Sequence, residues 1–526
     1  MDSNSPHAAA NTMGPIGLAM NSRLDALDFV NELEERFRVE RWRTEGFHVW
    51  PLIRNEVLEV VDTAWSGRSF RPLLARLVQD EAHRLVRERS RSSLGTPVKG
   101  ARPVSRADVL FLCSVRDRVL LEGRWFHRYV DPYLSYLVEK GVSSQVLQAG
   151  TLYRDREPIY YPEHWIDIGH HVHTYFCIHR NSVTVSLIKP DEAEYRSFLE
   201  HIADRTGARQ ATFALLGLER MRDRLSELQV YVDCFRDLIS ASHSRFCFLV
   251  GCGSPQGRAI CIACAQLGVV SIDLQHGVLG DTNPAYGHWN RLPERGYEMI
   301  PAQFWCWSDE EKMIIDTWAG RSGNVHQAVV VGYPWLAMWL EREGPVRNVS
   351  VAAERRLAGM RGEVNILYTF QPIEGFGYRV PEAVVQAIDE SPPGWKWWIR
   401  LHPDMLHDMD NCRQFLGGRC ANGRFEVEHA TILPLPLLLG YMQAHVTQWS
   451  SVVLEAMTFG VPSILLHPQG RDLFRQPIRL GCATIWEPEQ GSLTQCIAGV
   501  FSRKCHPVTT GEDWRTVVDQ WLTQVQ

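Results

Sequence analysis

The sequence predicts an α/β protein with two domains, each built on a parallel sheet and together preceded by a helical extension. The chain of 526 residues is long enough for two or three domains and a large core. Short buried strands followed by turns and helices begin at residue 107 and again at residue 365. Short helices wedged between apolar strands, as in residues 448–466, are typical of parallel sheets, whose ligands bind outside the carboxyl ends of the strands.

These patterns divide the chain into five segments. Residues 1–104 comprise a Ser/Asn/Ala/Gly-rich start that we expect to be disordered, a helical subdomain and a basic linker. Residues 105–335 form the first α/β domain, 336–363 a charged helical crossover, 364–512 the second α/β domain and 513–526 a C-terminal amphipathic helix. Within the first segment, apolar spacing predicts a helix from Leu24 to about Phe37, and we expect the aromatic residues around Trp50 to fix the helical subdomain.

Composition limits the compartment and the partners. A net charge of −6 argues against general nucleic-acid binding. Thirteen cysteines without a regular framework indicate a reduced, cytoplasmic chain, in which Cys261 and Cys264 are expected to pack in the core. We find no signal peptide in the first thirty residues and no apolar run near the ~18 residues of a membrane span. The basic residues of 81–106 suggest either a solvated linker or peripheral contact with anionic lipid of the inner membrane.

The stretch QWSSVVLEAMTFGVPSILL at residues 448–466 predicts a strand end, a turn, a short helix and a second strand. Ser450 suits the N-cap, and the hydroxyls of Ser450 and Ser451 can satisfy backbone N–H groups of the first turn. Gly460 suits the end of the helix, and Pro462 prevents its continuation. A helix start of this kind either binds an anion or is merely capped by its serines.

A second stretch upstream points to the same chemistry. The segment 397–403, WWIRLHP, predicts a buried strand that ends in Arg400, His402 and Pro403, with the proline forcing the chain out of the strand. His402 either binds a phosphate or only caps the strand. Two donor groups and two hydroxyls at neighbouring strand ends favour a nucleotide phosphate site. Gln371 begins a glycine-containing loop that can approach a nucleotide closely.

RLHP followed by SSVVLEAMTFGVPSILL resembles the nucleotide-sugar half of GT-B glycosyltransferases that build bacterial surface polysaccharides, in particular the sialyltransferase-like and Kdo-transferase-like groups. The resemblance implies two Rossmann-like domains that face each other across a cleft, and a donor-phosphate role for His402, Pro403, Ser450 and Ser451. It favours a CMP-linked Kdo or nonulosonic acid donor, with UDP- and CDP-linked donors behind. The common pair of Glu residues eight positions apart is missing, so Glu455 either binds a sugar or ribose hydroxyl or lies on the helix surface.

In the first domain, the candidates follow the ends of two predicted strands. After the strand 107–115 comes a charged loop in which Asp117 and Glu122 are candidate general bases or, alternatively, surface ion-pair partners. After the strand 269–274, Gln275, His276 and Gly277 would present an imidazole to the cleft. The resemblance places His276 opposite the donor, where it could stabilise the leaving phosphate, and the alternative is a structural histidine.

We therefore predict a metal-independent glycosyltransferase that moves a sugar from a nucleotide-activated donor to a growing glycan or a lipid-linked acceptor, with no separate cofactor. The alternatives are a non-catalytic nucleotide-sugar-binding assembly protein and a GT-B-type sugar epimerase. Asp408 and Asp410 match the D-x-D pattern of metal-dependent transferases, but after the His-Pro turn a solvated helix start is the preferred interpretation.

Overall fold

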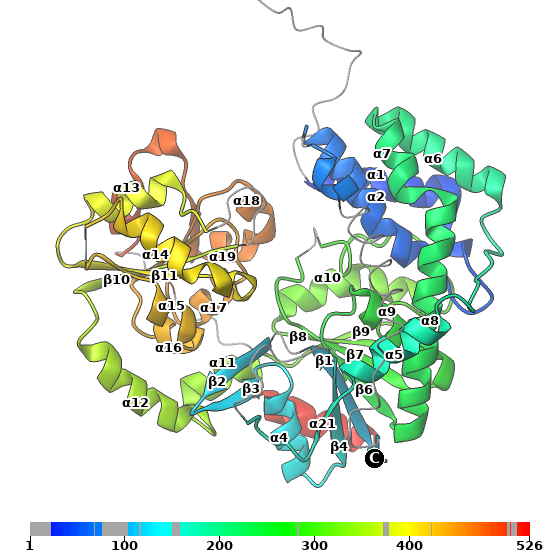
Figure 1. Ribbon diagram of the computed structural model, residues 1–526, viewed down its shortest axis with the longest axis horizontal. Coiled ribbons are helices and arrows are strands. Elements are labelled where there is room, and N and C mark those ends of the chain that lie inside the picture. Colours follow the sequence, from blue (N-terminus) through cyan, green and yellow to red (C-terminus); the bar gives the residue numbers. More distant parts are fainter. Residues whose placement is uncertain are drawn as a thin grey trace, which may run out of the picture.

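The computed structural model describes residues 23–67, 69–75, 104–114, 117–149, 158–280, 283–323, 325–371, 378–421, 423–501, 505 and 513–525. These residues form two lobes, each with a parallel sheet (Figure 1). The two sheets fall within the ranges predicted for the two α/β domains, and the boundaries themselves stay predictions. The basic linker and the loop 372–377 after Gln371 lie largely or wholly outside the described residues.

The first sheet has seven parallel strands in the order β5-β4-β1-β6-β7-β8-β9. Strand β1 lies inside this sheet, between β4 and β6, and is buried from Val109 to Cys113, as expected for a strand covered on both faces. The strands are β1 Val109–Ser114, β4 Ser144–Ala149, β5 Trp165–Asp167, β6 Phe246–Leu249, β7 Val270–Leu274, β8 Gln303–Cys306 and β9 Gln327–Val330, with helices α4 Asp131–Glu139, α5 Gly169–His179, α8 Leu218–Ser242, α9 Pro255–Leu267 and α10 Asp309–Ala319.

A helical layer covers the upper end of this domain in Figure 1. It consists of α1 Arg23–Phe37, α2 Trp50–Trp65, α6 Glu192–Thr206 and α7 Arg209–Leu216. Helix α1 matches the helix predicted from residue 24, and its apolar face packs into the core of the first domain through Leu27, Val30 and Leu33. Trp42, Trp50 and Phe198 pack edge-to-face in this layer, so the aromatic residues hold the helical subdomain together as expected.

The second sheet has six parallel strands in the order β12-β11-β10-β13-β14-β15. Its strands are β10 Val364–Thr369, β11 Trp395–Arg400, β12 Phe425–Glu426, β13 Ala444–Thr447, β14 Ser463–Leu465 and β15 Ala483–Ile485. Its helices are α13 Glu382–Glu390, α14 Met409–Gly417, α15 Glu428–Ile432, α16 Leu435–Leu439, α17 Val452–Thr458, α18 Gln469–Leu473, α19 Arg475–Arg479 and α20 Leu493–Val500. Strands β13 and β14 flank α17, which is the strand–helix–strand order predicted for residues 448–466.

The chain passes between the lobes twice. Helices α11 Pro334–Glu341 and α12 Val346–Ala358 lead to the second sheet, and α21 Trp514–Val525 returns to the first (Figure 1). Trp521 packs edge-on against Phe248 and Trp305 beneath the first sheet, and Arg515 forms an ion pair with Glu341 at 3.2 Å. The C-terminal helix therefore anchors the end of the chain on the first domain.

The two lobes meet along the carboxyl ends of their strands. One apolar cluster includes Tyr129 and Tyr333 from the first domain's side and Ala456 and Val461 from the second. In a separate cluster, Val278 of the first domain packs among residues around Trp449 and Leu454. Helix α17, which follows the Ser-Ser turn, therefore lies at the contact between the domains.

The segment after β1 is an antiparallel hairpin rather than a charged loop. Its strands are β2 Arg118–Leu121 and β3 Arg124–His127, and they are joined by Glu122 and Gly123. Both turn residues have positive φ, 48° and 74°, which is the backbone shape of a two-residue hairpin turn. This turn was not predicted from the sequence, because glutamate is uncommon at a position with positive φ.

One cysteine pair departs from the expectation of a reduced chain. Cys482 and Cys505 form a disulfide with their Cα atoms 4.9 Å apart. Their separation of 23 residues matches no regular framework, so spacing alone could not identify the pair. Cys261 and Cys264 are both buried and free, in agreement with the core role predicted for them.

Candidate functional site at the domain interface

In the second domain, Gln371 joins two of the loops predicted to bind the nucleotide. Its Oε1 accepts a hydrogen bond from the backbone N–H of Trp449 at 2.7 Å. This bond ties the end of β10 to the turn after β13, which carries the two serines. Gln371 therefore supports the Ser-Ser turn, whatever it contacts in a ligand.

The Ser-Ser turn differs in detail from the prediction. Ser451, not Ser450, is the N-cap residue of α17, and its side chain makes no capping hydrogen bond. The Ser450 hydroxyl accepts the N–H of Val452 at 3.4 Å, so it partly satisfies the first turn. Helix α17 has only seven residues, and Ser451 is exposed at its start. Anion binding at this point would depend on the hydroxyls more than on the short helix.

Arg400 and His402 both have structural partners. The Arg400 guanidinium donates to the carbonyls of Ala430 and Leu433 at 2.6 and 2.7 Å, which fixes the connection between α15 and α16. Burial lowers the pKa of Arg400 to about 10, and the nearby charge of Glu455 opposes that shift. His402 accepts the N–H of Asp404 through Nδ1 at 3.3 Å, so the capping role is present. Pro403 is the first residue of the 3₁₀ turn that follows.

Glu455 lies inside the interface rather than on the surface of α17. Its side chain is only 6% exposed, which removes the helix-surface alternative. Burial raises the pKa of Glu455, while Arg128, Arg400 and the Tyr333 hydroxyl act in the opposite direction. Tyr333 lies near enough to favour the carboxylate, although the geometry of a full hydrogen bond between the two groups is not reached.

Opposite Glu455, the first domain presents Arg128. Its guanidinium forms an ion pair with Asp117 at 3.2 Å and stacks over the ring of Tyr129 at 4.7 Å. Burial would lower the pKa of Arg128, but Tyr129, Tyr333, Asp117 and Glu455 together raise it well above its usual value. Asp117 therefore orients an arginine at the interface, and its role as a general base stays a prediction.

The rings of Tyr129 and Tyr333 form an aromatic pair beside Arg128. Their rings stack with centroids 5.8 Å apart, and Trp307 stacks on the other side of Tyr333 at 4.0 Å. Sequence reasoning missed Arg128, Tyr129 and Tyr333. Tyr333 belongs to the stretch VVVGYP, which ends a predicted strand just before the crossover. Its place at the end of a strand was the signal that could have marked it as a site residue.

His276 follows β7 as predicted, and its ring contacts the ring of Tyr129. Its carbonyl accepts the Tyr129 hydroxyl at 2.8 Å. Its ring packs beside Gly251, where a φ of +93° requires glycine and an added Cβ would lie 3.8 Å from the ring. Asp273 accepts the N–H groups of Gly251 and Cys252, both at 3.1 Å, and so holds this turn against the imidazole.

Glu122 lies apart from this group. It is exposed at the tip of the β2–β3 hairpin, and in the described part of the chain no hydrogen bond or ion pair joins it to the other candidates. Its role as a base stays a prediction.

Four buried polar atoms from both domains make no hydrogen bond within the described residues. They are Nε of Arg128, Nδ1 of His276, the Tyr333 hydroxyl and Oε2 of Glu455. Buried polar groups in proteins are almost always hydrogen-bonded, so a cluster without protein partners indicates a place for a polar ligand. We regard this group as the candidate functional site.

A buried polar cluster lies behind the hairpin, at the carboxyl ends of β1 and β4. Asp131 is fully buried and accepts the N–H of His127 at 2.7 Å, and the Arg118 guanidinium donates to Gln148 at 2.8 Å. Burial raises the pKa of Asp131 to about 7.

This shift predicts a pH dependence of stability. The folded state keeps a proton on Asp131 that the unfolded chain releases near pH 4, so the free energy of unfolding should fall by about 2–4 kcal/mol as pH rises from 4 to 7. Asp131→Asn should remove that component of the slope in urea unfolding, whereas the exposed control Asp204→Asn should keep it. Equal slopes in the two variants would contradict the assignment.

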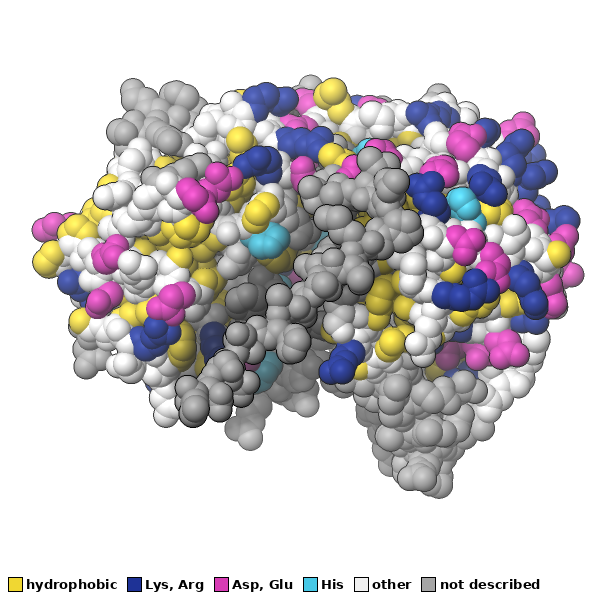
Figure 2. Space-filling model, turned by 90° about the horizontal axis from the view of Figure 1, so that it is seen from above, with side chains coloured by type: hydrophobic (Ala, Val, Ile, Leu, Met, Phe, Trp, Pro, Cys, Tyr) yellow, Lys and Arg dark blue, Asp and Glu magenta, His cyan; other side chains and the backbone are white. Residues whose placement is uncertain are grey.

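Two further properties concern metals and membranes. Across the described ranges, no group of three or more His, Cys, Asp or Glu side chains is arranged to hold a metal ion, and the segment after Pro403 instead pairs Asp410 with Arg413 at 2.7 Å. Among the helices that the structure describes, none combines the length and apolarity needed to span a bilayer. On the face seen in Figure 2, basic and acidic side chains are interspersed.

No protein-family model matches this sequence, and no curated protein sequence does. The structure is similar to UDP-GlcNAc 2-epimerase of Methanocaldococcus jannaschii in complex with UDP-GlcNAc and UDP, with a TM-score of 0.50 and 10% identity over 79% of this chain and 99% of that chain. A Neisseria meningitidis UDP-GlcNAc 2-epimerase bound to UDP-GlcNAc and a Siraitia grosvenorii ugt transferase in complex with UDP align over the same shares, at 11% identity, with TM-scores of 0.46 and 0.41.

The first of these likenesses confirms the predicted GT-B fold class, with two α/β domains of parallel strands facing each other. At this level of identity the likeness is one of fold. The narrower resemblance to the sialyltransferase-like and Kdo-transferase-like groups finds no support among these structures.

Proposed function

We propose that this protein is a glycosyltransferase that binds a nucleotide-activated sugar between its two domains. The observation that carries the proposal is the convergence of unpartnered polar atoms of Arg128, His276, Tyr333 and Glu455 where the carboxyl ends of two parallel sheets meet. Open α/β folds bind their ligands at this edge. The proposal extends to an acceptor that is a growing glycan or a lipid-linked sugar.

Each part of the site has a proposed task. Glu455 accepts hydrogen bonds from hydroxyls of the ribose or the sugar, because a buried carboxylate offers two acceptor oxygens. Arg128 neutralises charge that builds up on the departing phosphate, and His276, His402 and the hydroxyls of Ser450 and Ser451 donate hydrogen bonds to it. Pro403 fixes the turn that follows His402. Asp117 holds Arg128 in place and is the remaining candidate for the base that activates the acceptor.

Two classes of sugar donor are candidates, one linked to CMP and one linked to UDP. The resemblance carried by the His402-Pro403 and Ser450-Ser451 pairs favours a CMP-linked Kdo or nonulosonic acid. The Methanocaldococcus jannaschii epimerase, in contrast, was solved in complex with UDP-GlcNAc and UDP. That neighbour also makes a GT-B-type sugar epimerase the second candidate function. A non-catalytic nucleotide-sugar-binding protein would retain binding without turnover.

A thermal-shift screen against CMP, CDP, UDP, GDP and UDP-GlcNAc tests the proposal. A ligand that binds the folded state raises the melting temperature by mass action, by an amount that grows with its concentration relative to Kd. We expect one nucleotide to give a clear shift that His402→Ala weakens. No shift with any of the five would contradict nucleotide-sugar binding.

Products then distinguish the activities. The test uses a sugar donor that carries the nucleotide giving the thermal shift. Incubation of this donor without acceptor, followed by NMR of the sugar ring, would reveal an epimer if the protein is an epimerase. A transferase needs an acceptor and should leave the ring configuration of the donor unchanged. Asp117→Ala should then reduce turnover more than donor binding, and equal turnover in this variant would remove Asp117 as the base.

A further inference from the structure

A cavity of about 660 Å³ lies between the domains. Helices α1 and α10 of the first domain line it, together with residues 288–290, and α19 lines it from the second domain. Asn31 of α1, Trp289 and Asn290 form one side, the start of α10 at Asp309 and Glu310 forms another, and Arg479 closes it from the second domain. Its volume lies in the range of small-molecule sites. None of the residues proposed for the nucleotide lines it.

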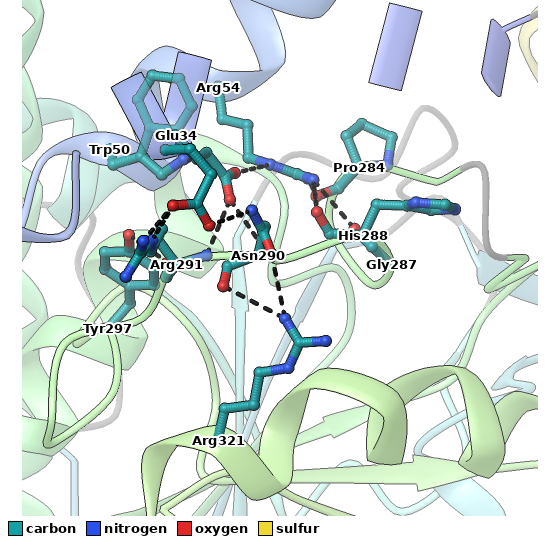
Figure 3. A network of polar contacts seen from close by, with 11 residues as sticks. Glu34, Trp50, Arg54, Pro284, Gly287, His288, Asn290, Arg291, Tyr297 and Arg321 are labelled. Carbon is teal, nitrogen blue, oxygen red and sulfur yellow. Dashed lines mark hydrogen bonds and ion pairs between the residues drawn. The ribbon is translucent and has the colours of Figure 1, made fainter. Parts of the chain in front are cut away.

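Arg54 and Glu34 hold the segment that carries Asn290 in place (Figure 3). The guanidinium of the fully buried Arg54 stands over the ring of Trp289 at 4.3 Å and donates to the carbonyls of Gly287 and His288. Glu34 accepts the backbone N–H of Asn290 at 2.8 Å. The segment that carries Trp289 and Asn290 is therefore preorganised, which lowers the entropic cost of binding.

The charges around the cavity balance. Asp309 and Glu310 supply two negative charges, and Arg321 and Arg479 supply two positive charges, with Glu310 and Arg479 paired across the domains at 3.6 Å. Arg321 also donates to Oδ1 of Asn290 at 3.3 Å. Such a lining gives no net attraction to a phosphate or to an organic cation, so an uncharged ligand fits it best.

Two lining residues have polar atoms that no described group satisfies. Oδ1 of Asn31 is a buried acceptor, and Nε1 of Trp289, in a side chain only 3% exposed, is a buried donor. A hydroxyl both donates and accepts, so a polyhydroxylated ligand can satisfy both kinds of atom. Met313 and Ile314 add apolar surface on α10, which suits the C–H face of a sugar ring.

We propose that this cavity binds an uncharged saccharide unit. The unit is either the end of an acceptor glycan or a free sugar, because both present the same ring and hydroxyls. Both domains contribute to the lining, so an occupied cavity would also favour the arrangement in which Arg479 meets Glu310. This cavity is a different place from the proposed nucleotide site. The acceptor-glycan form of the inference rests on the proposed transferase function, whereas binding of a free sugar does not.

Saturation-transfer NMR on the full-length protein tests the inference. The probes are methyl glycosides of glucose, galactose, N-acetylglucosamine and N-acetylgalactosamine, with cellobiose, lactose and N,N′-diacetylchitobiose. Glucose 6-phosphate and methyl glucuronide serve as charged counterparts. Stronger signals from the disaccharides than from the glycosides would indicate a glycan end, and equal signals a free sugar.

Thr317→Trp should fill the cavity, since Thr317 lines it from the exposed side of α10, and should reduce the transfer at least fivefold. Asp316→Trp is the matched control on the same helix, because Asp316 does not line the cavity, and should leave the transfer unchanged. Asn31→Ala adds no bulk and should weaken binding about 3–10-fold, through one lost hydrogen bond.

The inference is overturned if no neutral saccharide gives a signal that these variants reduce, or if the charged sugars bind more strongly. The nucleotide thermal shift reports on the other site, so failure there and failure here are separate results. We expect the nucleotide shift to persist in Thr317→Trp.

Discussion

Replacing Arg54 with methionine should lower the free energy of unfolding of the first domain by about 3–5 kcal/mol, because it leaves a buried carboxylate without its counter-charge. Arg54 and Glu34 are both fully buried, with Nε and Oε1 3.0 Å apart. The substitution also deprives the carbonyls of Pro284, Gly287 and His288 of their donor (Figure 3). Urea unfolding followed by tryptophan fluorescence, with attention to separate domain transitions, measures the effect.

A matched variant isolates burial as the cause. Arg36 lies on the exposed side of α1, two residues from Glu34, and Arg36→Met should change stability by less than about 1 kcal/mol. The double variant Arg54→Met with Glu34→Leu removes both charges and should recover part of the loss. A loss in Arg54→Met no larger than in Arg36→Met would show that the pair contributes little to the fold.

The same pair illustrates what a single sequence can reveal. Local signals predicted the elements around α17 well, although not the exact N-cap residue, because Gly460 and Pro462 act on their own neighbours along the chain. The strand that ends at Arg400 was predicted for the same reason. The order of such elements predicted two α/β domains with parallel sheets, since alternating strands and helices have few ways to pack. The GT-B arrangement of the two domains came from the resemblance of RLHP and SSVVLEAMTFGVPSILL to glycosyltransferases.

The partners of the functional side chains could not be predicted in this way. Arg54 binds carbonyls about 230 residues away, and Arg128 meets Glu455 only after two domains have folded and closed. The segment near Trp50 was expected to be structural, and that expectation is met, but its buried ion pair carries no local signature. His402 is different, because its position was predicted from the sequence. The structure contains its capping bond to Asp404, whereas its proposed contact with phosphate can be tested only with a bound ligand.

Glu455→Gln should weaken nucleotide binding about 10–100-fold if Glu455 holds the ribose or sugar hydroxyls. Hydrogen bonds to charged groups contribute about 1.5–3 kcal/mol, and each 1.4 kcal/mol is a factor of ten. Glutamine fills the same space but offers one acceptor oxygen and no charge. Calorimetric titration with the nucleotide that gives the largest thermal shift measures Kd, and the exposed Glu428→Gln on α15 is the control.

The pH dependence of that affinity separates a direct contact from a change in packing. Burial raises the pKa of Glu455, so its carboxylate is protonated at a higher pH than an exposed glutamate. Binding to the wild-type protein should therefore weaken as pH falls through this raised pKa, because the protonated group accepts fewer hydrogen bonds. Glu455→Gln has no proton to gain and should lose that dependence. If both proteins bound the nucleotide equally at every pH, Glu455 would only bridge the domains to Arg128, and the hydroxyl-binding group would have to be sought elsewhere at the interface.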